Sequence, residues 1–567
     1  MKKNQYRLLA FAVIALVAMP VIGDRLHCQE PAKDKVEAKK NDPNLQAGRV
    51  INVFSSVISG INTLYVDTID MQRITERGIN SMLSQLDPYT VYMPESDRED
   101  FAFMTTGEYG GIGAYIQQKD SLVYVQSPMP GSPAEKAGLK MGDYFVTIDG
   151  KEVIPGNASK VSGLLKGPVG TDVKVTFRRL GENKDREVSL TREKVVVDQV
   201  SHSGLYGDGV GYIRLNSFTD KSAENVMDAY NRLNKQKKLK GLILDLRSNG
   251  GGVLDDAIKI LGMFLPEKTM VLYTEGKLPE TSQKYYTAGP VVDTKLPIVV
   301  MINGSSASAS EIVSGTIQDL DRGVLVGTKS FGKGLVQSTR PVPYNGVLKV
   351  TIARYYIPSG RCIQQLDYSH RNPDGSVAAV PDSLTKVFKT KNGREVRDGG
   401  GIRPDITVED ETMSSVVFSM MRDGYIFDFT NKLFLTKPAP KSLKDVVITD
   451  EDYNNFIDYL EKSDFKYGEM SLQGLENLKK MAEFEGYKEV SADAFEQLKK
   501  SLTPSLKRDV APHKEQIKGL LRGLLASHYY GSAGQYAIGL ESDPTFIKAL
   551  ELFKNPDEYR KILTPKS

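Results

Sequence analysis

The chain has 567 residues, 40% of them hydrophobic, which is enough for several domains with their own cores. Its 74 Lys and Arg residues nearly balance 71 Asp and Glu residues, and the charges are interspersed, so no nucleic-acid partner is expected. The five histidines and two cysteines form no cluster with metal-ligand spacing, and no glycine-rich turn carries a P-loop lysine. We therefore expect no metal and no cofactor.

The chain begins with several positive charges, followed by an uncharged apolar stretch from Leu8 to Ile22. The stretch is shorter than the ~20 residues of a membrane-spanning helix. Residues 1–23 therefore predict a signal peptide and a periplasmic location in the cell envelope, with retention as a short inner-membrane anchor as the alternative. Charged neighbours around Cys28 argue against lipid attachment at that cysteine.

Residues 24–46 are charged and rich in Pro and Lys without an apolar period, which predicts a tether. Residues 47–100 predict an N-terminal helical segment of two helices, ended by the turn at Leu86–Tyr89. The apolar residues at helical spacing are Val53, Val57, Ile58, Ile61 and Leu64 in the first helix, and Ile74, Ile79, Met82 and Leu83 in the second.

Residues 101–180 contain two glycine-bearing motifs. The first is a loop followed by an alternating strand, and the second predicts a short helix and turn between Ser132 and Asp143. Together they resemble a PDZ domain, in which the loop amides bind a terminal carboxylate and the adjacent strand edge adds a peptide. Lys166 stands where relatives often carry arginine. The lysine keeps the positive charge but cannot form the paired hydrogen bonds that an arginine makes to a carboxylate. The loop residues are Gly110, Gly111, Ile112 and Gly113.

Residues 181–410 alternate apolar runs with helical patterns. Buried strands are expected at Val210–Ile213, Leu242–Leu246 and Ile298–Ile302. Such an alternation predicts an α/β core with a mostly parallel sheet.

Two motifs inside this core indicate hydrolytic chemistry. Ser308 lies in a serine-rich turn that ends with Glu311, and Lys333 follows in Phe-Gly-Lys-Gly. A serine needs a base to take its proton, and a lysine can serve only when its amine is neutral, which requires an apolar setting. Ser308 and Glu311 also fit a helix capping box, and a helix N-terminus offers free amides to an oxyanion.

These motifs resemble those of the carboxy-terminal processing peptidases, also called tail-specific proteases. The resemblance implies a multidomain α/β protein: a crotonase/Clp-like protease core with an inserted PDZ domain, N-terminal helices and a C-terminal helical region. It also implies a Ser-Lys dyad of Ser308 and Lys333, with Gln337 as a third catalytic residue. Gly251 and Ala309 correspond to the oxyanion-binding amides, with Gly252 as the alternative to Gly251.

The implied activity is that of an exported serine endopeptidase that captures the free C-terminus of a protein or peptide and cuts upstream through an acyl-enzyme. An adaptor or activator protein and a homo-oligomer are further expected partners. One alternative is a PDZ scaffold without activity, which the complete set of motifs argues against. Another is a triad that uses His202 as the base, because triads assemble in space.

Residues 411–567 predict a C-terminal helical domain. Its clearest pattern is an apolar stripe that fits either a core or a partner helix, so the region is expected to serve assembly or adaptor binding. The stripe consists of Ile517, Leu520, Leu521, Leu524 and Leu525.

Overall fold

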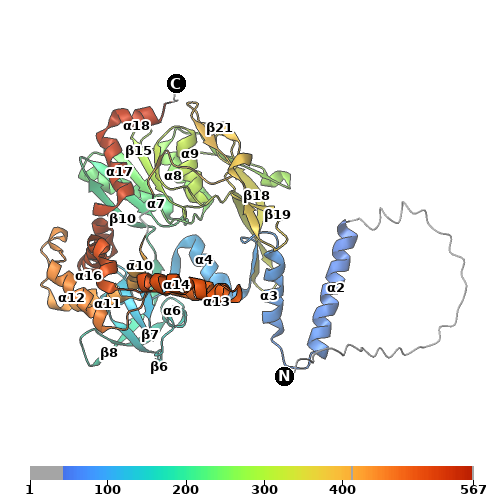
Figure 1. Cartoon of the computed structure of the whole chain (residues 1–567). Helices are drawn as coiled ribbons and strands as arrows, with labels where there is room; N and C mark the ends of the chain where they lie inside the picture. The colour runs from blue at the N-terminus through green and yellow to red at the C-terminus, as the bar shows by residue number, and fades with distance from the viewer. Residues whose placement is uncertain (1–42, 410–412, 565–567) are drawn as a thin grey trace, which may run out of the picture. The chain divides into compact units, whose positions relative to one another are not determined.

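The computed structural model describes residues 43–409 and 413–564 (Figure 1), which fall into two units, Met1–Gly78 and Ile79–Ser567. The predicted signal and most of the predicted tether lie outside the described residues. The expectation of a periplasmic protein with an inner-membrane anchor is corrected by one finding. Within the described ranges, no helix has the length and apolar character needed to cross a membrane.

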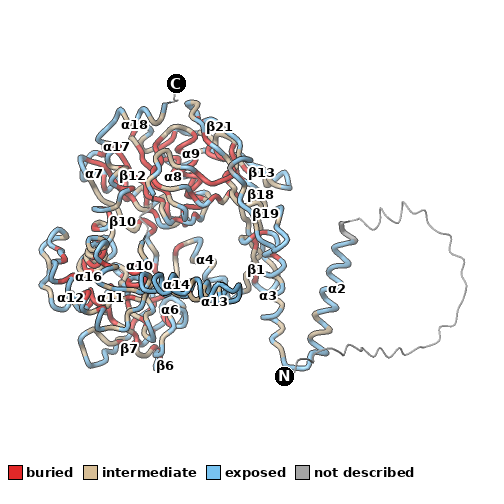
Figure 2. Tube along the Cα trace, in the orientation of Figure 1, coloured by how far each residue is buried: buried red, intermediate tan, exposed pale blue. Residues whose placement is uncertain are grey.

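The first unit contains α2 (Pro43–Leu64) and the beginning of α3 (Met71–Leu83), which confirms two predicted helices. α2 starts inside the stretch expected to be a tether, because a proline suits the first turn of a helix. Its apolar side chains are largely exposed (Figure 2), including Val50, Ile51, Val53, Phe54, Val57 and Leu64.

The PDZ-like domain is a sheet in the order β3-β4-β5-β7-β8. It closes around a core that includes Phe145, Ile148 and Val161. β8 pairs with β7, so the sheet continues past residue 180 to Thr191. The strands are β3 (Ala114–Lys119), β4 (Leu122–Pro128), β5 (Tyr144–Ile148), β7 (Asp172–Arg178) and β8 (Asp185–Thr191).

The second unit also holds a six-stranded sheet in the order β10-β11-β12-β15-β16-β23. β10 and β11 are antiparallel and the remaining neighbours are parallel, which confirms the predicted α/β core. The strands are β10 (Val200–Tyr206), β11 (Val210–Leu215), β12 (Gly241–Asp245), β15 (Ile298–Ile302), β16 (Val324–Gly327) and β23 (Ile406–Thr407).

One face of this sheet packs against three helices. They are α7 (Ser222–Gln236), α8 (Leu254–Phe264) and α9 (Ala309–Asp319), and their apolar side chains join the largest core cluster. A second, antiparallel sheet adjoins this core and includes β17 (Leu335–Val342) and β18 (Gly346–Tyr356). Both motifs singled out in the sequence, at Ser308 and Lys333, therefore lie at the ends of elements that are fixed by a core.

The other face of the sheet is covered by the end of the chain. α17 (Pro544–Lys554) and α18 (Pro556–Ile562) place Phe546, Leu552 and Tyr559 against strand residues such as Tyr212 and Ile243. The hydroxyl of Tyr559 also bonds the backbone of Ile298 in β15. The last two helices are thus a layer of the α/β core.

The rest of the tail forms a helical bundle with its own core. The predicted stripe lies on α16 (Lys514–Ser542), where Ile517, Leu521 and Leu525 are buried. The bundle also contacts the PDZ-like domain: Lys119 of β3 pairs with Asp428 at 2.6 Å. The remaining helices are α10 (Ser415–Arg422), α11 (Tyr425–Thr436), α12 (Asp450–Lys462), α13 (Glu469–Phe484), α14 (Lys488–Leu502) and α15 (Leu506–Val510).

Candidate active site

Ser308 occupies a sharp turn between β15 and α9. Its backbone has φ 57° and ψ −113°, a conformation that costs an L residue energy and occurs where function requires it. Its Oγ stands at the capping-box position opposite the Glu311 N–H without a side-chain cap hydrogen bond, and the half-buried side chain lines a cavity of about 670 Å³. The turn thus presents the hydroxyl to the cavity, as nucleophilic serines at strand-to-helix turns do.

The neighbouring serines of the motif are committed to structure. Ser306 donates to the carbonyl of Leu246 at 2.8 Å, and Ser310 donates to the carbonyl of Asn249 at 2.8 Å. Both side chains are fully buried. Ser305 is exposed but does not line the cavity, so Ser308 is the serine of this turn that faces it.

Glu311 joins the serine turn to the lysine loop. Its Oε2 accepts hydrogen bonds from the backbone N–H groups of Ser308 at 2.8 Å and Lys333 at 2.9 Å. Its Oε1 accepts from the Ser330 hydroxyl at 2.5 Å and the Gly332 N–H at 2.7 Å. Burial raises the pKa of this carboxyl to about 7, while the four donors oppose the rise. The glutamate reaches back to Ser308 as the capping box predicts, and it also spans to the second motif.

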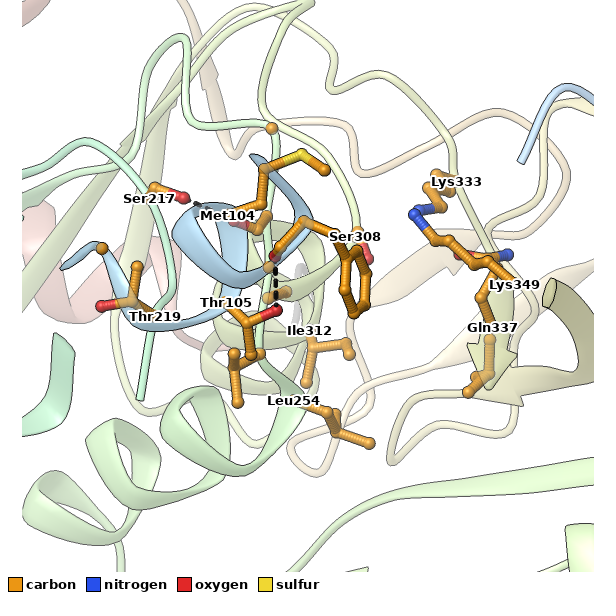
Figure 3. Close-up of a pocket in the computed structure, with 18 of the residues that line it drawn as sticks. Met104, Thr105, Ser217, Thr219, Leu254, Ser308, Ile312, Lys333, Gln337 and Lys349 are labelled. Carbon is orange, nitrogen blue, oxygen red and sulfur yellow. Dashed lines mark hydrogen bonds between the residues drawn. The ribbon is translucent and has the colours of Figure 1, made fainter. Parts of the chain in front are cut away.

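Lys333 projects into the same cavity from the loop before β17. Burial and, second, the nearby charge of Lys349 lower the pKa of Lys333 to about 8, against the opposing charges of Glu311 and Asp87. Its Nζ lies 4.4 Å from the ring centroid of Tyr89. Figure 3 shows the side chains of Lys333 and Lys349 together, with a gap between them and Ser308. No hydrogen bond between the described atoms joins Lys333 to Ser308.

Gln337 lies on β17 and lines the cavity as well. Its amide nitrogen donates to Thr351 Oγ1 at 3.1 Å on the neighbouring strand, and not to Lys333. The structure therefore brings Gln337 to the site and fixes it through β18.

The glycine turn after β12 lies directly against the serine turn. A Cβ on Gly251 would stand 2.7 Å from Ser308 Cβ and 2.9 Å from the nitrogen of Ala309. The N–H of Gly251 donates to Asn249 Oδ1 at 2.9 Å. By contrast, the N–H groups of Gly252 and Ala309 bond no described residue, and both residues line the cavity.

The cavity wall opposite the core comes from α4 (Arg98–Thr106), the helix that precedes the PDZ-like domain. It contributes Phe101, Phe103, Met104 and Thr105. Lys166 of the PDZ-like domain pairs with Asp100 of α4 at 3.3 Å. The departure from arginine thus falls at a contact between this domain and the cavity wall.

His202 lies elsewhere. Its Nε2 hydrogen-bonds Tyr206 Oη at 2.8 Å, and its ring packs against Tyr212 and Tyr536. Burial lowers the pKa of His202 to about 4. It does not line the cavity of Ser308, so a triad built on this histidine has no geometric support.

The predicted carboxylate-binding loop joins β2 (Glu108–Gly111) to β3. Ile112 and Gly113 are buried, and neither N–H donates to any described residue. Among the described residues β3 pairs with β4 alone, so its other edge, beside α6 (Ala158–Leu165), has no strand partner there. Free amides next to an open strand edge are what a peptide C-terminus requires.

Sequence reasoning missed three residues that position the site. The buried hydroxyl of Tyr355 lies 2.6 Å from the Lys333 carbonyl and 3.3 Å from that of Ser308. Asn249 accepts from Ala307 N–H at 3.0 Å through its own carbonyl, linking the glycine and serine turns. The ring of Tyr89 packs against the Nζ atom of Lys333. Nothing local in the sequence marks these contacts.

Three family models match the chain. They are "Peptidase family S41" over residues 209–369, "PDZ domain" over 124–179, and "Probable PDZ-protease, C-terminal helical domain" over 416–553. The first model covers Ser308 and Lys333.

Among curated proteins, the chain is similar to a "Carboxy-terminal-processing protease" of Bartonella bacilliformis, with 39% identity over 55% of this chain and 72% of the relative. It is also similar to a "Probable CtpA-like serine protease" of Staphylococcus aureus, with 34% identity over 62% of this chain and 71% of the relative. Among solved structures, a photosystem II D1 C-terminal processing protease has 28% identity, with a TM-score of 0.34 over 62% of this chain and 86% of that one.

Proposed function

Because the chain belongs to the family of carboxy-terminal processing proteases, serine-type peptidases with a PDZ domain, we propose that Ser308 and Lys333 form its catalytic dyad. We further propose that the PDZ domain captures the free C-terminus of the substrate. One observation carries the dyad: of the four serines in the turn, only Ser308 lines the cavity, and it shares that cavity with a lysine of lowered pKa.

In the proposed reaction, neutral Lys333 takes the proton of Ser308 Oγ as that oxygen attacks the carbonyl carbon of the peptide bond. The tetrahedral intermediate collapses when Lys333 returns the proton to the leaving nitrogen, which releases the downstream peptide. Water then attacks the acyl-enzyme, with Lys333 again accepting and returning a proton. Ser308 is regenerated, and the reaction consumes the peptide bond and one water molecule.

The intermediate places a negative charge at the N-terminus of α9. The N–H of Ala309 is free to bind it, and the positive end of the helix dipole favours it. Gly251 is the proposed second donor. Its N–H must first leave Asn249 Oδ1, whereas the N–H of Gly252 is already free, so Gly252 remains the alternative.

Chemistry also requires Lys333 to move. Its Nζ now rests over the Tyr89 ring, without a hydrogen bond to Ser308. A rotation of the side chain away from Tyr89 would bring the amine to the serine, while Glu311 holds the lysine backbone in place. We assign to Gln337 the role of orienting the amine in that arrangement.

The test is cleavage of an unstructured protein by the purified full chain. Ser308→Ala should abolish turnover and leave thermal unfolding nearly unchanged, because losing its part of the capping box costs only about 1 kcal/mol. Ser306→Ala is the matched control: it removes a buried hydrogen bond, costs about 1 kcal/mol of stability, and should retain activity below its melting temperature. Persistent turnover in Ser308→Ala would remove the assignment, and an inactive wild type would favour the scaffold alternative.

A further inference from the structure

The glycine turn beside Ser308 is anchored at its start by a charged cluster. Arg247 binds Asp245 through Nε at 3.0 Å and Nη2 at 2.8 Å. The same Nη2 reaches Asp543, the residue before α17, at 2.6 Å. Asp245 is fully buried at the end of β12, and Arg214 also binds it at 3.1 Å. Two guanidinium groups thus face two carboxylates where the glycine turn begins.

This cluster is largely buried, although Arg214, Arg247 and Asp543 line a cavity of about 570 Å³. The Arg247 side chain is 14% exposed and that of Asp543 is 17% exposed. Burial opposes the charge on Asp245, but the two arginines and the Tyr212 hydroxyl outweigh it, so the pKa of Asp245 is lowered. An ion pair in such a place is stronger than one at the surface, and removal of one partner leaves a costly unpaired charge.

Asp543 sits on a rigid support. Its Oδ1 accepts from the N–H of Phe546 at 3.1 Å and caps α17, while its Oδ2 is left for Arg247. Phe546 and Leu552 of α17 are buried against the protease sheet. The carboxylate is therefore held at a fixed place relative to the strand ends.

The position of Arg247 affects where the backbone amides that face Ser308 lie, because only a few residues separate them in the chain. Ser248, the next residue, has φ 60° and donates its N–H to Asn303 at 2.9 Å. Asn249 then contacts the serine turn through its carbonyl and Gly251 through its side chain. A turn this short and strained gives little room for Arg247 to shift without moving Gly251 and Gly252.

We propose that Asp543, acting through Arg247, is a positioning residue for the oxyanion-binding turn, so that the last helices of the C-terminal region take part in catalysis. This inference rests on the proposed function, because it assumes that the turn binds the oxyanion beside Ser308. It assigns to the tail a role different from the assembly or adaptor role that its sequence suggested.

Two substitutions of Asp543 separate the ion pair from the helix cap. Asp543→Asn keeps an oxygen that caps α17 but removes the charge that Arg247 binds. Asp543→Glu keeps the charge but is a poorer cap. If the pair positions the turn, kcat should fall about tenfold in Asp543→Asn and recover in Asp543→Glu, a smaller loss than the 10²–10³ of deleting a donor outright.

Two further readouts exclude a general loss of structure. The dissociation constant of a PDZ-binding peptide and KM should stay within about twofold of wild type, whereas affinity for a peptide aldehyde, whose adduct with Ser308 carries the oxyanion, should fall in parallel with kcat. Asp450→Asn is the matched control, since it removes a carboxylate that pairs with Lys514 and Lys518 in the helical bundle. It should leave every readout unchanged.

The outcomes distinguish the two proposals. If Ser308→Ala cleaves as well as wild type, the proposed function fails and this inference falls with it. If cleavage depends on Ser308 but Asp543→Asn has wild-type kcat, only the role of Asp543 is refuted. It is equally refuted if kcat follows the melting temperature across both variants, because Asp543 would then serve as a helix cap alone.

Discussion

The Oε2 atom of Glu311 lies 2.9 Å from the backbone nitrogen of Lys333, and the same oxygen also binds the nitrogen of Ser308 at 2.8 Å. One buried carboxylate thereby fixes the backbones of the proposed nucleophile and the proposed base. The separation of the two side chains is then set by side-chain rotation, because their backbones are tied to a common point.

Replacing Glu311 tests this tie. In Glu311→Gln, the amide oxygen can still accept from Ser308 and Lys333, but the amide NH₂ then faces the N–H of Gly332. A buried donor without an acceptor costs about 1–3 kcal/mol, so the melting temperature should fall and kcat should drop at least about tenfold. The measurements are thermal unfolding and steady-state kinetics. Exposed Glu267→Gln is the control, and unchanged kcat in Glu311→Gln would show that the tie is dispensable.

The pH dependence of activity should report Lys333. The pKa of its amine is lowered to about 8, and the base is competent only when neutral, so kcat/KM should rise with pH through about 8. Lys349→Met removes a like charge, which raises the pKa of Lys333 and moves the profile to higher pH. Activity near pH 7.5 should fall and recover in more alkaline buffer. A profile that moves equally in Lys295→Met, an exposed lysine outside the cavity, would contradict this assignment.

The carboxylate loop can be tested with two glycines of the same backbone conformation. Gly113 has φ 71°, and a Cβ there would lie 2.4 Å from Ser132 Cβ; Gly131 has φ 72° with no atom within 4 Å. Both alanine variants carry the strain of a left-handed residue, about 1–2 kcal/mol. Only Gly113→Ala should lose affinity for a peptide with a free C-terminus, measured by titration calorimetry.

Amidation of the peptide should weaken wild-type binding in the same way, because the free N–H groups of Ile112 and Gly113 would lose their anion. Equal affinity for acid and amide forms would exclude recognition of the C-terminus. Deletion of the PDZ domain then separates two roles: a gate predicts faster basal cleavage, and a tether predicts weaker capture of tailed substrates.

The C-terminal region should respond differently to two deletions. Ending the chain at Ser542 removes α17 and α18 and exposes the sheet face that Phe546, Leu552 and Tyr559 cover. Each lost side chain removes about 1.5–3 kcal/mol of burial, a large part of the 5–15 kcal/mol that stabilises a domain. The protein should therefore be insoluble or unfolded, judged by size-exclusion chromatography and circular dichroism.

Residues 469–502, the α13–α14 hairpin, provide the comparison. Of their side chains only Leu475 is buried, and the ends of the hairpin meet where Gly468 faces Pro504. Replacement by a short Gly-Ser linker should leave folding and cleavage close to wild type. If the two deletions were equally harmful, the last helices would not be a special layer of the core.

The sequence alone determined the family, the α/β core with three of its six strands, the helical tail and the set of candidate residues. It could do so because local periodicity decides which face of an element is buried, and because Ser308 and Lys333 lie in motifs whose residues are adjacent in the chain. The PDZ-like loop was recognisable for the same reason. These signals can be recognised in the sequence without knowing which distant segments come into contact.

Only the tertiary structure decided how those segments are joined. Glu311 meets Lys333 across 22 residues, Tyr355 meets Ser308 across 47, and Arg247 meets Asp543 across 296. It also showed that the end of the tail, which the sequence suggested to be an accessory module, is a layer of the protease core. Contacts of this kind depend on the packing of whole elements, and a single sequence carries no periodic signal for which buried carboxylate will face which distant amide or guanidinium group.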